Sequence, residues 1–287
     1  MTRQKSFQHM QLEVLSYRAR LFDEQIETLS RLNNGYKGEL LFDEMLMQHH
    51  EIIHVKDLLF QYDGSREIQI DNIIIARDMC YIFEVKNFSF NLRIDAKGCF
   101  FYENGKECSM LNSQVERQKD SVRQLMNDIG YPMVIHHYLV FINPNQIMYG
   151  LESNHPIIMS NALNKFLEHN MKPNRKNYDF LESSINERRL LRSKHDQYYE
   201  INLDDMKKGV FCPNCNQRMR KVSRYRCQCG ICLKYVGTVD AIKLLIRDIR
   251  CLNPEFKLDS IILSRLSNGE ISSSAIRRLR LNGSVDF

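Results

Sequence analysis

The chain has 287 residues, of which 43% are hydrophobic and 26% are charged, and its formal net charge is +5. This length suits one large domain or two smaller ones, and the apolar content is ordinary for a protein with a sizeable core. No stretch is apolar for long enough to cross a bilayer, and the N-terminus has a charged helical pattern instead of a signal peptide. We therefore expect a cytoplasmic protein with no membrane partner.

The charge is distributed unevenly along the chain. Residues 207–287 contain 16 Lys and Arg against 6 Asp and Glu, a net charge of +10, so residues 1–206 carry a net charge of about −5. A basic C-terminal part predicts attraction to nucleic-acid phosphates. The alternative is a solvated basic surface with no partner.

Residues 1–34 contain an amphipathic helical pattern. Apolar side chains recur at intervals of three or four residues, which predicts a helix over residues 7–32. We expect this helix to pack on the following domain, and contact with a protein partner or a second copy is the alternative. The Asn-Asn-Gly run at 33–35 predicts the end of this helix, and the next helical pattern contains Glu39 in its first turn.

Residues 68–86 predict a β-hairpin, because two apolar and β-branched segments flank a polar turn at 77–78. With the turn centred there, residues whose numbers sum to 155 face each other, so Asp71 is opposite Glu84. Directly opposed residues point to the same face of a sheet, with Cβ atoms about 5 Å apart. Lys86 shares this face because it lies two residues beyond Glu84.

Two carboxylates and a lysine on one apolar sheet face suit a divalent metal. Like charges that close repel each other unless a cation lies between them. Mg²⁺ prefers oxygen ligands and usually takes one or two carboxylates together with several waters. Lys86 would then orient an attacking water or stabilise charge on a phosphate. The alternative is a surface salt bridge from Lys86 to Asp71 or Glu84 on an exposed sheet face.

Short strands, a helix and a longer strand follow this hairpin. We expect short antiparallel strands within residues 87–102 to extend the sheet. Ser113 is a candidate cap for the next helix, in which Gln114 and Gln118 lie one turn apart on the same face. Residues 132–142 form a continuous apolar strand of the kind that is buried on both faces. This order of elements predicts a mixed α/β sandwich.

This ordered set of residues resembles the nuclease-related domain family. The set is Gly35-x-x-Gly38-Glu39, Ile70-Asp71, Glu84-Val85-Lys86-Asn87, Gln114 with its helix, and the strand from Tyr138 to Asn143 with the proline after it. The resemblance covers roughly residues 35–150. The family is similar to the PD-(D/E)XK nucleases, so the resemblance implies an α/β fold with a restriction-endonuclease-like mixed sheet flanked by helices.

The resemblance also implies roles for five side chains. Asp71 and Glu84 would bind a divalent metal, Mg²⁺ or Mn²⁺, and Lys86 would assist the water. Glu39 and Gln114 would complete the catalytic site, although Glu39 has an alternative role in stabilising the helix dipole. A proline often found shortly before the family's glutamine is absent here, which loosens the start of the helix but removes no catalytic group.

Residues 209–236 predict a small zinc ribbon. The cysteines of this segment are Cys212, Cys215, Cys227, Cys229 and Cys232. Two cysteine knuckles separated by about a dozen residues bind a structural Zn²⁺, since four thiolates leave no open position for catalysis. Gly230 lets the backbone turn toward the sulfur before it, so we prefer Cys227 and Cys229 as the second knuckle. The alternative is Cys229 with Cys232, which has the commoner spacing.

The segments on either side of the zinc ribbon have helical patterns. Residues 151–208 predict a helical linker. Residues 237–287 predict a basic domain of three short helices, the last of which carries Arg277, Arg278 and Arg280. This arrangement resembles a helix-turn-helix reader in which the arginines bind nucleic acid. The alternative is a small packed helical cap with a basic face.

The sequence therefore favours a metal-dependent nuclease or nuclease-like DNA-processing protein. The zinc ribbon and the basic C-terminal part would hold nucleic acid, and DNA is favoured over RNA. The alternative is a non-catalytic, zinc-containing nucleic-acid-binding or regulatory protein in which the nuclease-like core is a scaffold. Binding of a divalent metal that depends on Asp71 distinguishes the two.

Overall fold

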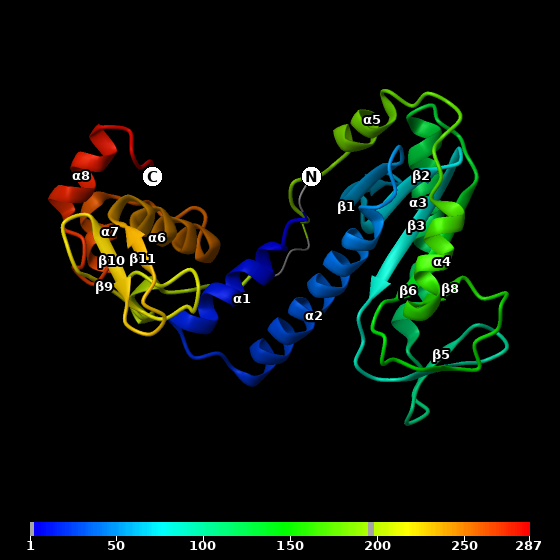
Figure 1. Cartoon of the computed structure of the whole chain (residues 1–287), viewed down its shortest axis with the longest axis horizontal. Coiled ribbons are helices and arrows are strands. Elements are labelled where there is room, and N and C mark those ends of the chain that lie inside the picture. The colour runs from blue at the N-terminus through cyan, green and yellow to red at the C-terminus, as the bar shows by residue number, and fades with distance from the viewer. Residues whose placement is uncertain (1–2, 195–197) are drawn as a thin grey trace. The chain divides into compact units, whose positions relative to one another are not determined.

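The computed structural model describes residues 3–194 and 198–287, apart from the side chains of residues 110, 112 and 113 (Figure 1). The chain forms two compact units. The first, which we call the sheet unit, comprises Met1–Gln4 and Arg31–His195, and the second, the cysteine unit, comprises Lys5–Ser30 and Asp196–Phe287. Each unit contains several of the segments predicted from the sequence. The boundaries of those segments therefore remain predictions.

The N-terminal helical pattern forms two helices, α1 (Phe7–Arg18) and α2 (Asp23–Leu46). The prediction of one helix over residues 7–32 was wrong. The first helix ends where the buried Arg18 is held by Asp248 of α6 (Thr238–Leu252), with 2.8 Å between Nη2 and Oδ2. Because of this contact, α1 packs within the cysteine unit. Its predicted contact with a protein partner or second copy stays a prediction.

Helix α2 continues through the predicted break at 33–35. Asn and Gly each cost no more than about 1 kcal/mol relative to Ala inside a helix, so a long helix with tertiary contacts can include them. Gly38 has a packing reason for its place, since a Cβ there would lie 2.6 Å from the Cβ of Asn87. A Cβ at Gly35 would meet nothing within 4 Å.

A mixed β-sheet forms the centre of the sheet unit and confirms the predicted fold class (Figure 1). Its strand order is β1 (Ile53–Tyr62), β2 (Arg66–Ala76), β3 (Met79–Lys86), β6 (Ile135–Phe141) and β8 (Ile157–Met159). Strands β1, β2 and β3 pair antiparallel, whereas β6 is parallel to both β3 and β8. The sheet therefore places residues from distant parts of the sequence on neighbouring strands.

The β2–β3 hairpin has the predicted register. Asn72 is opposite Phe83 and Ala76 is opposite Met79, so the numbers of paired residues sum to 155. Arg77 and Asp78 have φ angles of 53° and 60°. Two central residues with positive φ give a tight turn whose twist matches that of the strands. The local turn thus sets the register that brings Asp71 beside β3.

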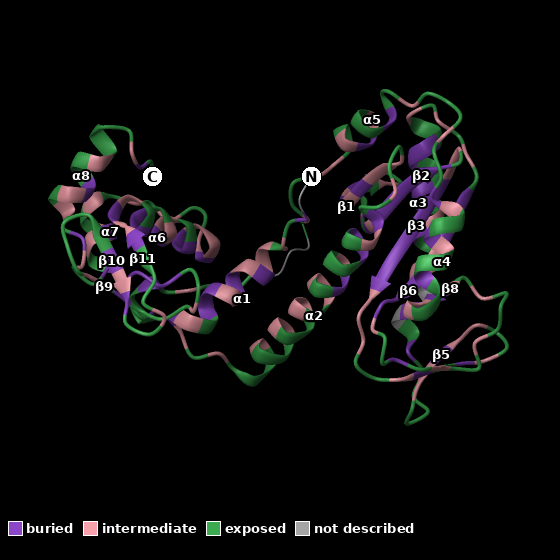
Figure 2. Ribbon diagram, viewed as in Figure 1, coloured by how far each residue is buried: buried purple, intermediate pink, exposed green. Residues whose placement is uncertain are grey.

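Helices cover both faces of this sheet, and the strands between them are buried (Figure 2). On one face, α3 (Ser109–Asp128) and α5 (Leu181–Glu187) pack against side chains such as Ile73 and Ile82. On the other face, α2 and α4 (Ser160–Asn170) pack against side chains such as Ile74 and Phe83. Alternate residues of each strand therefore face opposite helical layers.

Two local predictions in the sheet unit were wrong. The short strands β4 (Leu92–Ile94) and β5 (Phe100–Tyr102) do not extend the main sheet, because β4 pairs with β5 and with β7 (Met148–Tyr149) in a separate sheet. Helix α3 begins at Ser109, one turn before the expected start, so Ser113 lies inside the helix and is not its cap.

The cysteine unit contains a small antiparallel sheet and the C-terminal helices. Its strands are β9 (Met219–Lys221), β10 (Arg226–Cys229) and β11 (Tyr235–Gly237). The helices α6, α7 (Ser260–Leu266) and α8 (Ser273–Leu281) confirm the helical prediction for this region. Among the described residues of the whole chain, no helix is long and apolar enough to cross a membrane.

Candidate active site and cysteine cluster

The three polar residues predicted on the hairpin share one face of the sheet. Asp71 has the same strand parity as Ile73, and Glu84 and Lys86 have that of Ile82, so all three belong to the face covered by α3. Lys86 Nζ lies 2.6 Å from Glu84 Oε1. The backbone N–H of Val85 donates to Asp71 Oδ2 at 3.2 Å. Glu84 is only 4% exposed, so its pair with Lys86 is not the exposed salt bridge considered as an alternative.

Two glutamines from α3 fix the carboxylate of Glu84. Gln114 Nε2 donates to Glu84 Oε1 at 2.7 Å, and Gln118 Nε2 donates to Glu84 Oε2 at 2.8 Å. Lys86 Nζ also donates to Gln114 Oε1 at 3.3 Å. The spacing of four residues puts both amides on the same helix face, as predicted. Both oxygens of Glu84 are therefore oriented by side chains of this chain.

His137 on β6 extends this network behind Gln118. Its Nε2 lies 2.6 Å from Gln118 Oε1, and this nitrogen donates because the amide oxygen can only accept. Burial lowers the pKa of His137 to about 4, so the ring is neutral near pH 7. Its Nδ1 is buried with no hydrogen-bond partner among the residues described. Sequence reasoning missed His137, because only the parallel pairing of β3 with β6 brings it near the site.

Arg3 reaches the same region from the start of the chain. Its fully buried side chain forms ion pairs with Asp43, at 3.0 Å, and with Asp57, and lies 3.4 Å from Glu39 Oε2. Arg3 Nη1 also donates to the backbone carbonyl of Asp71 at 3.3 Å. This contact links Glu39 on α2 to the strand that carries Asp71. A single arginine far from the motif gives no sequence signal for such a role.

The site holds carboxylates that are costly to ionise together. Burial raises the pKa of Glu39 to about 7, opposed by Arg3 and assisted by Asp57 and Glu84. Burial, Glu84 and Glu39 all raise the pKa of Asp71 well above its ordinary value. A cation nearby would favour the charged forms of these groups. The donor set of clustered carboxylate oxygens has the chemistry that Mg²⁺ and Mn²⁺ prefer.

Strand β1 is distorted beside this site. Asp57 has a φ of 48°, which is unusual within a strand, and no pair is formed with the residue opposite, Asp71. Arg189 compensates by donating to the backbone carbonyls of Lys56 and Asp57. Such residues persist only where the surrounding contacts hold them, and they cluster at functional sites. Here the distortion directs the carboxylate of Asp57 to Arg3.

Residues 34–142 match the family model of the nuclease-related domain. The chain contains a nuclease-related domain. The match includes every predicted catalytic position, namely Glu39, Asp71, Glu84, Lys86 and Gln114. The chain matches no curated protein and no solved structure closely enough to count as similar.

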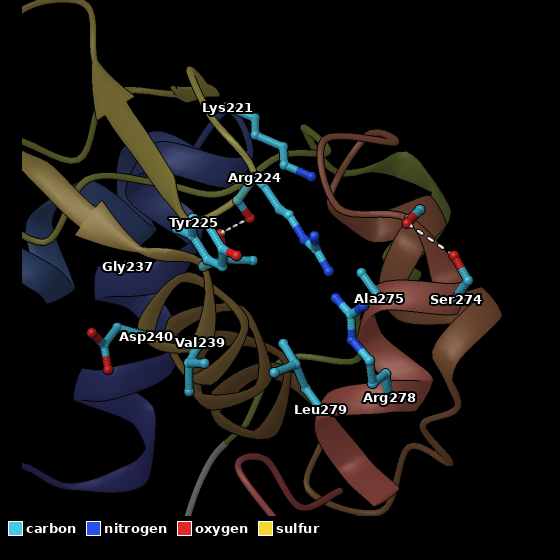
Figure 3. A pocket seen from close by; sticks show the side chains of 12 residues that line it. Lys221, Arg224, Tyr225, Gly237, Val239, Asp240, Ser274, Ala275, Arg278 and Leu279 are labelled. Carbon is cyan, nitrogen blue, oxygen red and sulfur yellow. Dashed lines mark hydrogen bonds between the residues drawn. The ribbon is translucent and has the colours of Figure 1, made fainter. Parts of the chain in front are cut away.

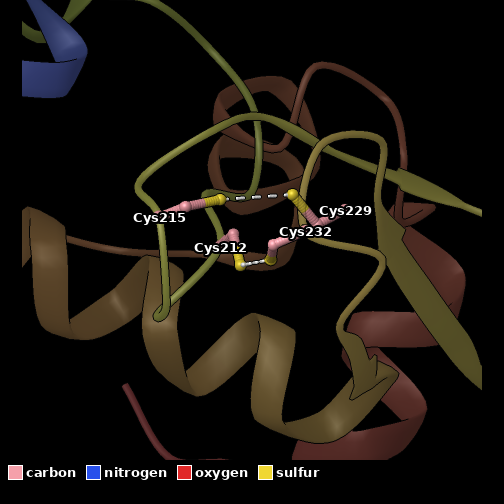
Figure 4. A group of neighbouring side chains, drawn as sticks. All are labelled: Cys212, Cys215, Cys229 and Cys232. Atoms are coloured by element: carbon pink, nitrogen blue, oxygen red, sulfur yellow. Dashed lines mark hydrogen bonds between the residues drawn. The ribbon is translucent and has the colours of Figure 1, made fainter.

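Four cysteines gather outside the nuclease-related domain (Figure 4). They are Cys212, Cys215, Cys229 and Cys232, whose sulfur atoms all lie within 4.8 Å of one another. This group is compatible with a zinc ribbon. A hydrogen bond from the backbone N–H of Lys234 lowers the pKa of Cys232 to about 6, which favours the thiolate that binds metal.

The preferred ligand set from sequence was wrong in one member. Cys227 does not belong to the group, and Cys232 takes its place. Cys227 lies inside β10, paired with Lys221 on one side and Val236 on the other, so its backbone is extended. A knuckle needs a turn between its two cysteines, and the chain turns only after Cys229. The alternative pair, Cys229 and Cys232, which has the commoner two-residue spacing, is therefore the one found in the group.

The carboxylates of the nuclease-related domain are less tightly gathered than these sulfurs. Among the described residues, the cysteine group is the one set of three or more His, Cys, Asp or Glu side chains whose ligand atoms approach one another this closely. In the acid site, amide and ammonium donors lie against the Glu84 oxygens instead. A cation at Glu84 would have to share or replace these donors.

The C-terminal arginines lie on α8 with exposed side chains. Arg278 lines a cavity, whereas the guanidinium of Arg280 lies 4.5 Å from the ring centroid of Phe287. Arg277 is exposed on the same helix. The predicted role of all three in nucleic-acid binding stays a prediction.

Proposed function

We propose that this chain is a divalent-metal-dependent nuclease, or a nuclease-like DNA-processing protein, that hydrolyses phosphodiester bonds. One observation carries the proposal: Asp71, Glu84 and Lys86 share one buried sheet face within a nuclease-related domain. Oxygen donors suit Mg²⁺ or Mn²⁺, and a lysine beside them suits charge that develops on a phosphate.

Each side chain has a role in this proposal. Asp71 and Glu84 hold the metal, and Glu39 adds a third carboxylate. Lys86 positions the attacking water through Nζ, and Gln114 orients the water or the substrate. The bound metal would polarise a phosphoryl oxygen and lower the pKa of water. The water oxygen would then bond to phosphorus and release a proton to solvent, the P–O bond to the leaving oxygen would break, and the leaving oxygen would take up a proton from solvent.

Gln118 and His137 are positioning residues for Glu84. Gln118 fixes the second carboxylate oxygen, and the buried neutral ring of His137 fixes the amide of Gln118. Since the amide oxygen of Gln118 is occupied by His137, its NH₂ group is directed at Glu84. This orientation favours one rotamer of the carboxylate that would hold the metal.

The cysteine unit supports the nucleic-acid part of the proposal. Cys212, Cys215, Cys229 and Cys232 would hold a structural Zn²⁺, because four sulfurs close a tetrahedral site. The basic C-terminal part, including the exposed arginines of α8, would bind the phosphate backbone of DNA in preference to RNA. A cytoplasmic location without a membrane partner is part of the same proposal.

The test is cleavage of labelled single- and double-stranded DNA and RNA by the purified chain with Mg²⁺, Mn²⁺ or EDTA. We expect cleavage with Mg²⁺ or Mn²⁺ and none with EDTA. Asp71→Ala and Lys86→Ala should abolish cleavage while leaving DNA binding mostly intact. Cleavage by either variant at the rate of the unaltered chain would overturn the assignment.

A second candidate is a non-catalytic nucleic-acid-binding or regulatory protein on a nuclease-like scaffold. The observation that favours it is the full set of protein donors around Glu84, which satisfies the carboxylate without a metal. This candidate predicts DNA binding without cleavage under every metal condition of the same assay. It also predicts no binding of Mn²⁺ that depends on Asp71.

A further inference from the structure

A basic cavity lies in the cysteine unit, outside the nuclease-related domain (Figure 3). Its volume is about 620 Å³, and its walls come from the end of β9 with the loop that follows it, the start of α6, and α8. The polar and aromatic side chains that line it include Lys221, Arg224, Tyr225, Ser274 and Arg278. The cavity is therefore built from segments about fifty residues apart in sequence.

Three cationic side chains converge on this cavity. Figure 3 shows Arg224 and Arg278 reaching toward each other across the opening, with Lys221 beside Arg224. Among the described residues, no ion pair joins any of these three cations to a carboxylate. Like charges so arranged repel one another, and an anion between them would remove the repulsion. Guanidinium groups match the geometry of phosphate oxygens.

Asp240 is the one acidic residue among the described residues that line the cavity, and Glu270 nearby accepts from the backbone N–H of Lys221 at 3.0 Å. Figure 3 shows Asp240 pointing away from both guanidinium groups. Its Oδ2 lies over Gly237, 3.2 Å from where a Cβ of that glycine would be, at the N-terminus of α6. Helix α8 has no acidic residue in its first turn, and the Ser272 hydroxyl contacts that of Ser274 instead of capping a backbone amide. Its positive end therefore adds to the attraction for an anion.

An exposed aromatic ring stands beside the cations. Tyr225 is 70% exposed, and the guanidinium of Arg224 lies 5.6 Å from its ring centroid. Thr238 fixes both residues, since its backbone N–H donates to the Tyr225 carbonyl at 2.9 Å and its hydroxyl to the Arg224 carbonyl at 3.2 Å. Single-stranded nucleic acids are bound by basic grooves with aromatic rings on which bases stack.

We propose that this cavity binds one nucleotide unit of a single-stranded nucleic acid. Its phosphate lies between Lys221, Arg224 and Arg278, and its base stacks on Tyr225. This inference rests on the proposed nucleic-acid function and adds a specific subsite to it. The cavity thus holds a strand at a place separate from the acid site of the nuclease-related domain. A free mononucleotide offers the same phosphate and base, so the experiment must separate the two sources.

The test measures binding of a fluorescent single-stranded DNA decamer to the zinc-loaded chain of 287 residues without added Mg²⁺ or Mn²⁺. Arg224→Ala and Arg278→Ala should each weaken binding by about tenfold, and Tyr225→Ala by about fivefold or more. Tyr225→Phe keeps the ring and should bind like the unaltered chain. Arg220→Ala is the matched control, since this exposed arginine lies on β9 beside Lys221 but does not line the cavity.

Equal losses of decamer affinity in Arg220→Ala and Arg224→Ala would overturn the inference. Such equal losses are what a general basic surface, without a specific cavity, would give. Competition separates the ligand sources: a mononucleotide or inorganic phosphate that binds as tightly as the decamer would overturn the strand assignment. A decamer that binds at least about tenfold more tightly than either would support it.

Failure of the proposed nuclease activity is distinguishable from failure of this inference. If the chain cleaves no substrate but the decamer still depends on Arg224 and Arg278, the cavity assignment stands without the activity. If the chain cleaves DNA but binding is unchanged in Arg224→Ala, Arg278→Ala and Tyr225→Ala, the cavity assignment fails and the activity stands.

Discussion

The acid site of the nuclease-related domain and the cysteine cluster are built in opposite ways. The four clustered cysteines lie within residues 212–232, a single short segment with a turn at each knuckle. The acid site takes Glu39 from α2, Asp71 from β2, Glu84 from β3 and Gln114 from α3. One site is specified by local turns, whereas the other exists only when the whole sheet unit has folded.

The two sites also differ in what surrounds their ligand atoms. The four sulfurs lie directly against one another, with 3.5 Å between those of Cys212 and Cys232 and 3.4 Å between those of Cys215 and Cys229. The carboxylate of Glu84 already accepts from Lys86, Gln114 and Gln118. The two arrangements suit the proposed metals differently, since four soft sulfur ligands favour a permanent Zn²⁺ and hard oxygen ligands favour an exchangeable Mg²⁺ or Mn²⁺.

The largest expected effect is loss of the cysteine site. Cys232→Ser removes one of four ligands, and structural Zn²⁺ contributes on the order of 10 kcal/mol to the folding of small zinc domains. We expect this variant to lose zinc and the cooperative unfolding of the cysteine unit, measured by metal analysis and thermal unfolding. Cys227→Ser is the matched control and should retain one zinc. Zinc retained in Cys232→Ser and lost in Cys227→Ser would reverse the ligand assignment.

The next effect tests whether the acid site depends on distant residues. Arg3→Ala removes the buried cation of Asp57 and leaves Asp43 with Lys56 alone, and breaking a buried pair costs about 3–5 kcal/mol. Chemical denaturation should show this loss in the sheet unit alone. Arg66→Ala removes an exposed pair with Asp63 and should change stability by less than about 1 kcal/mol. Equal effects of the two substitutions would contradict the role given to Arg3.

A smaller effect concerns the glycines of α2 near Glu39. Gly38→Ala places a Cβ against the Asn87 side chain, and such overpacking costs about 1–3 kcal/mol. Gly35→Ala meets open space in the same helix and should stabilise the chain by about 0.5–1 kcal/mol. Thermal unfolding of both variants measures the difference. A Gly38→Ala chain as stable as Gly35→Ala would show that α2 can shift away from β3.

The smallest effect near neutral pH is an acid sensitivity of the sheet unit. Burial lowers the pKa of His54 to about 4, whereas an unfolded histidine titrates near 6.5. Between these values the unfolded chain binds more protons, so stability rises with pH and falls as pH drops from about 6.5 to 4. His54→Gln should remove this dependence, which for a pKa lowered from about 6.5 to about 4 amounts to at most about 3 kcal/mol at its acid end. An unchanged pH profile of unfolding would contradict the burial of a neutral ring.

Local patterns predicted the parts of the fold that depend on neighbours in sequence. The alternation of apolar residues and the polar turn at 77–78 were enough for the hairpin register, and hence for the shared face of Asp71, Glu84 and Lys86. The run 33–35 misled, because tertiary contacts along α2 outweigh weak helix propensity. Gly230 led to the wrong choice of Cys227 as a zinc ligand. Cys227 is paired on both sides within β10, so the chain turns only after Cys229.

Long-range contacts decided what the sequence could not predict. Arg3, Asp57 and His137 reach the site through sheet pairing and through the return of the N-terminus to the sheet unit. None of them lies at a characteristic spacing from Asp71 or Glu84. The sequence shows that the C-terminal part is basic, but it does not show that Arg224 and Arg278 line the same cavity. Only the fold brings these two residues together.

The most direct test of the central claim is a calorimetric titration of the zinc-loaded chain with Mn²⁺. The account predicts binding with measurable heat in the unaltered chain and in Cys227→Ser, and loss of that heat in Asp71→Asn. No heat in the unaltered chain, or the same heat in Asp71→Asn, would contradict the assignment of a divalent metal to the acid site.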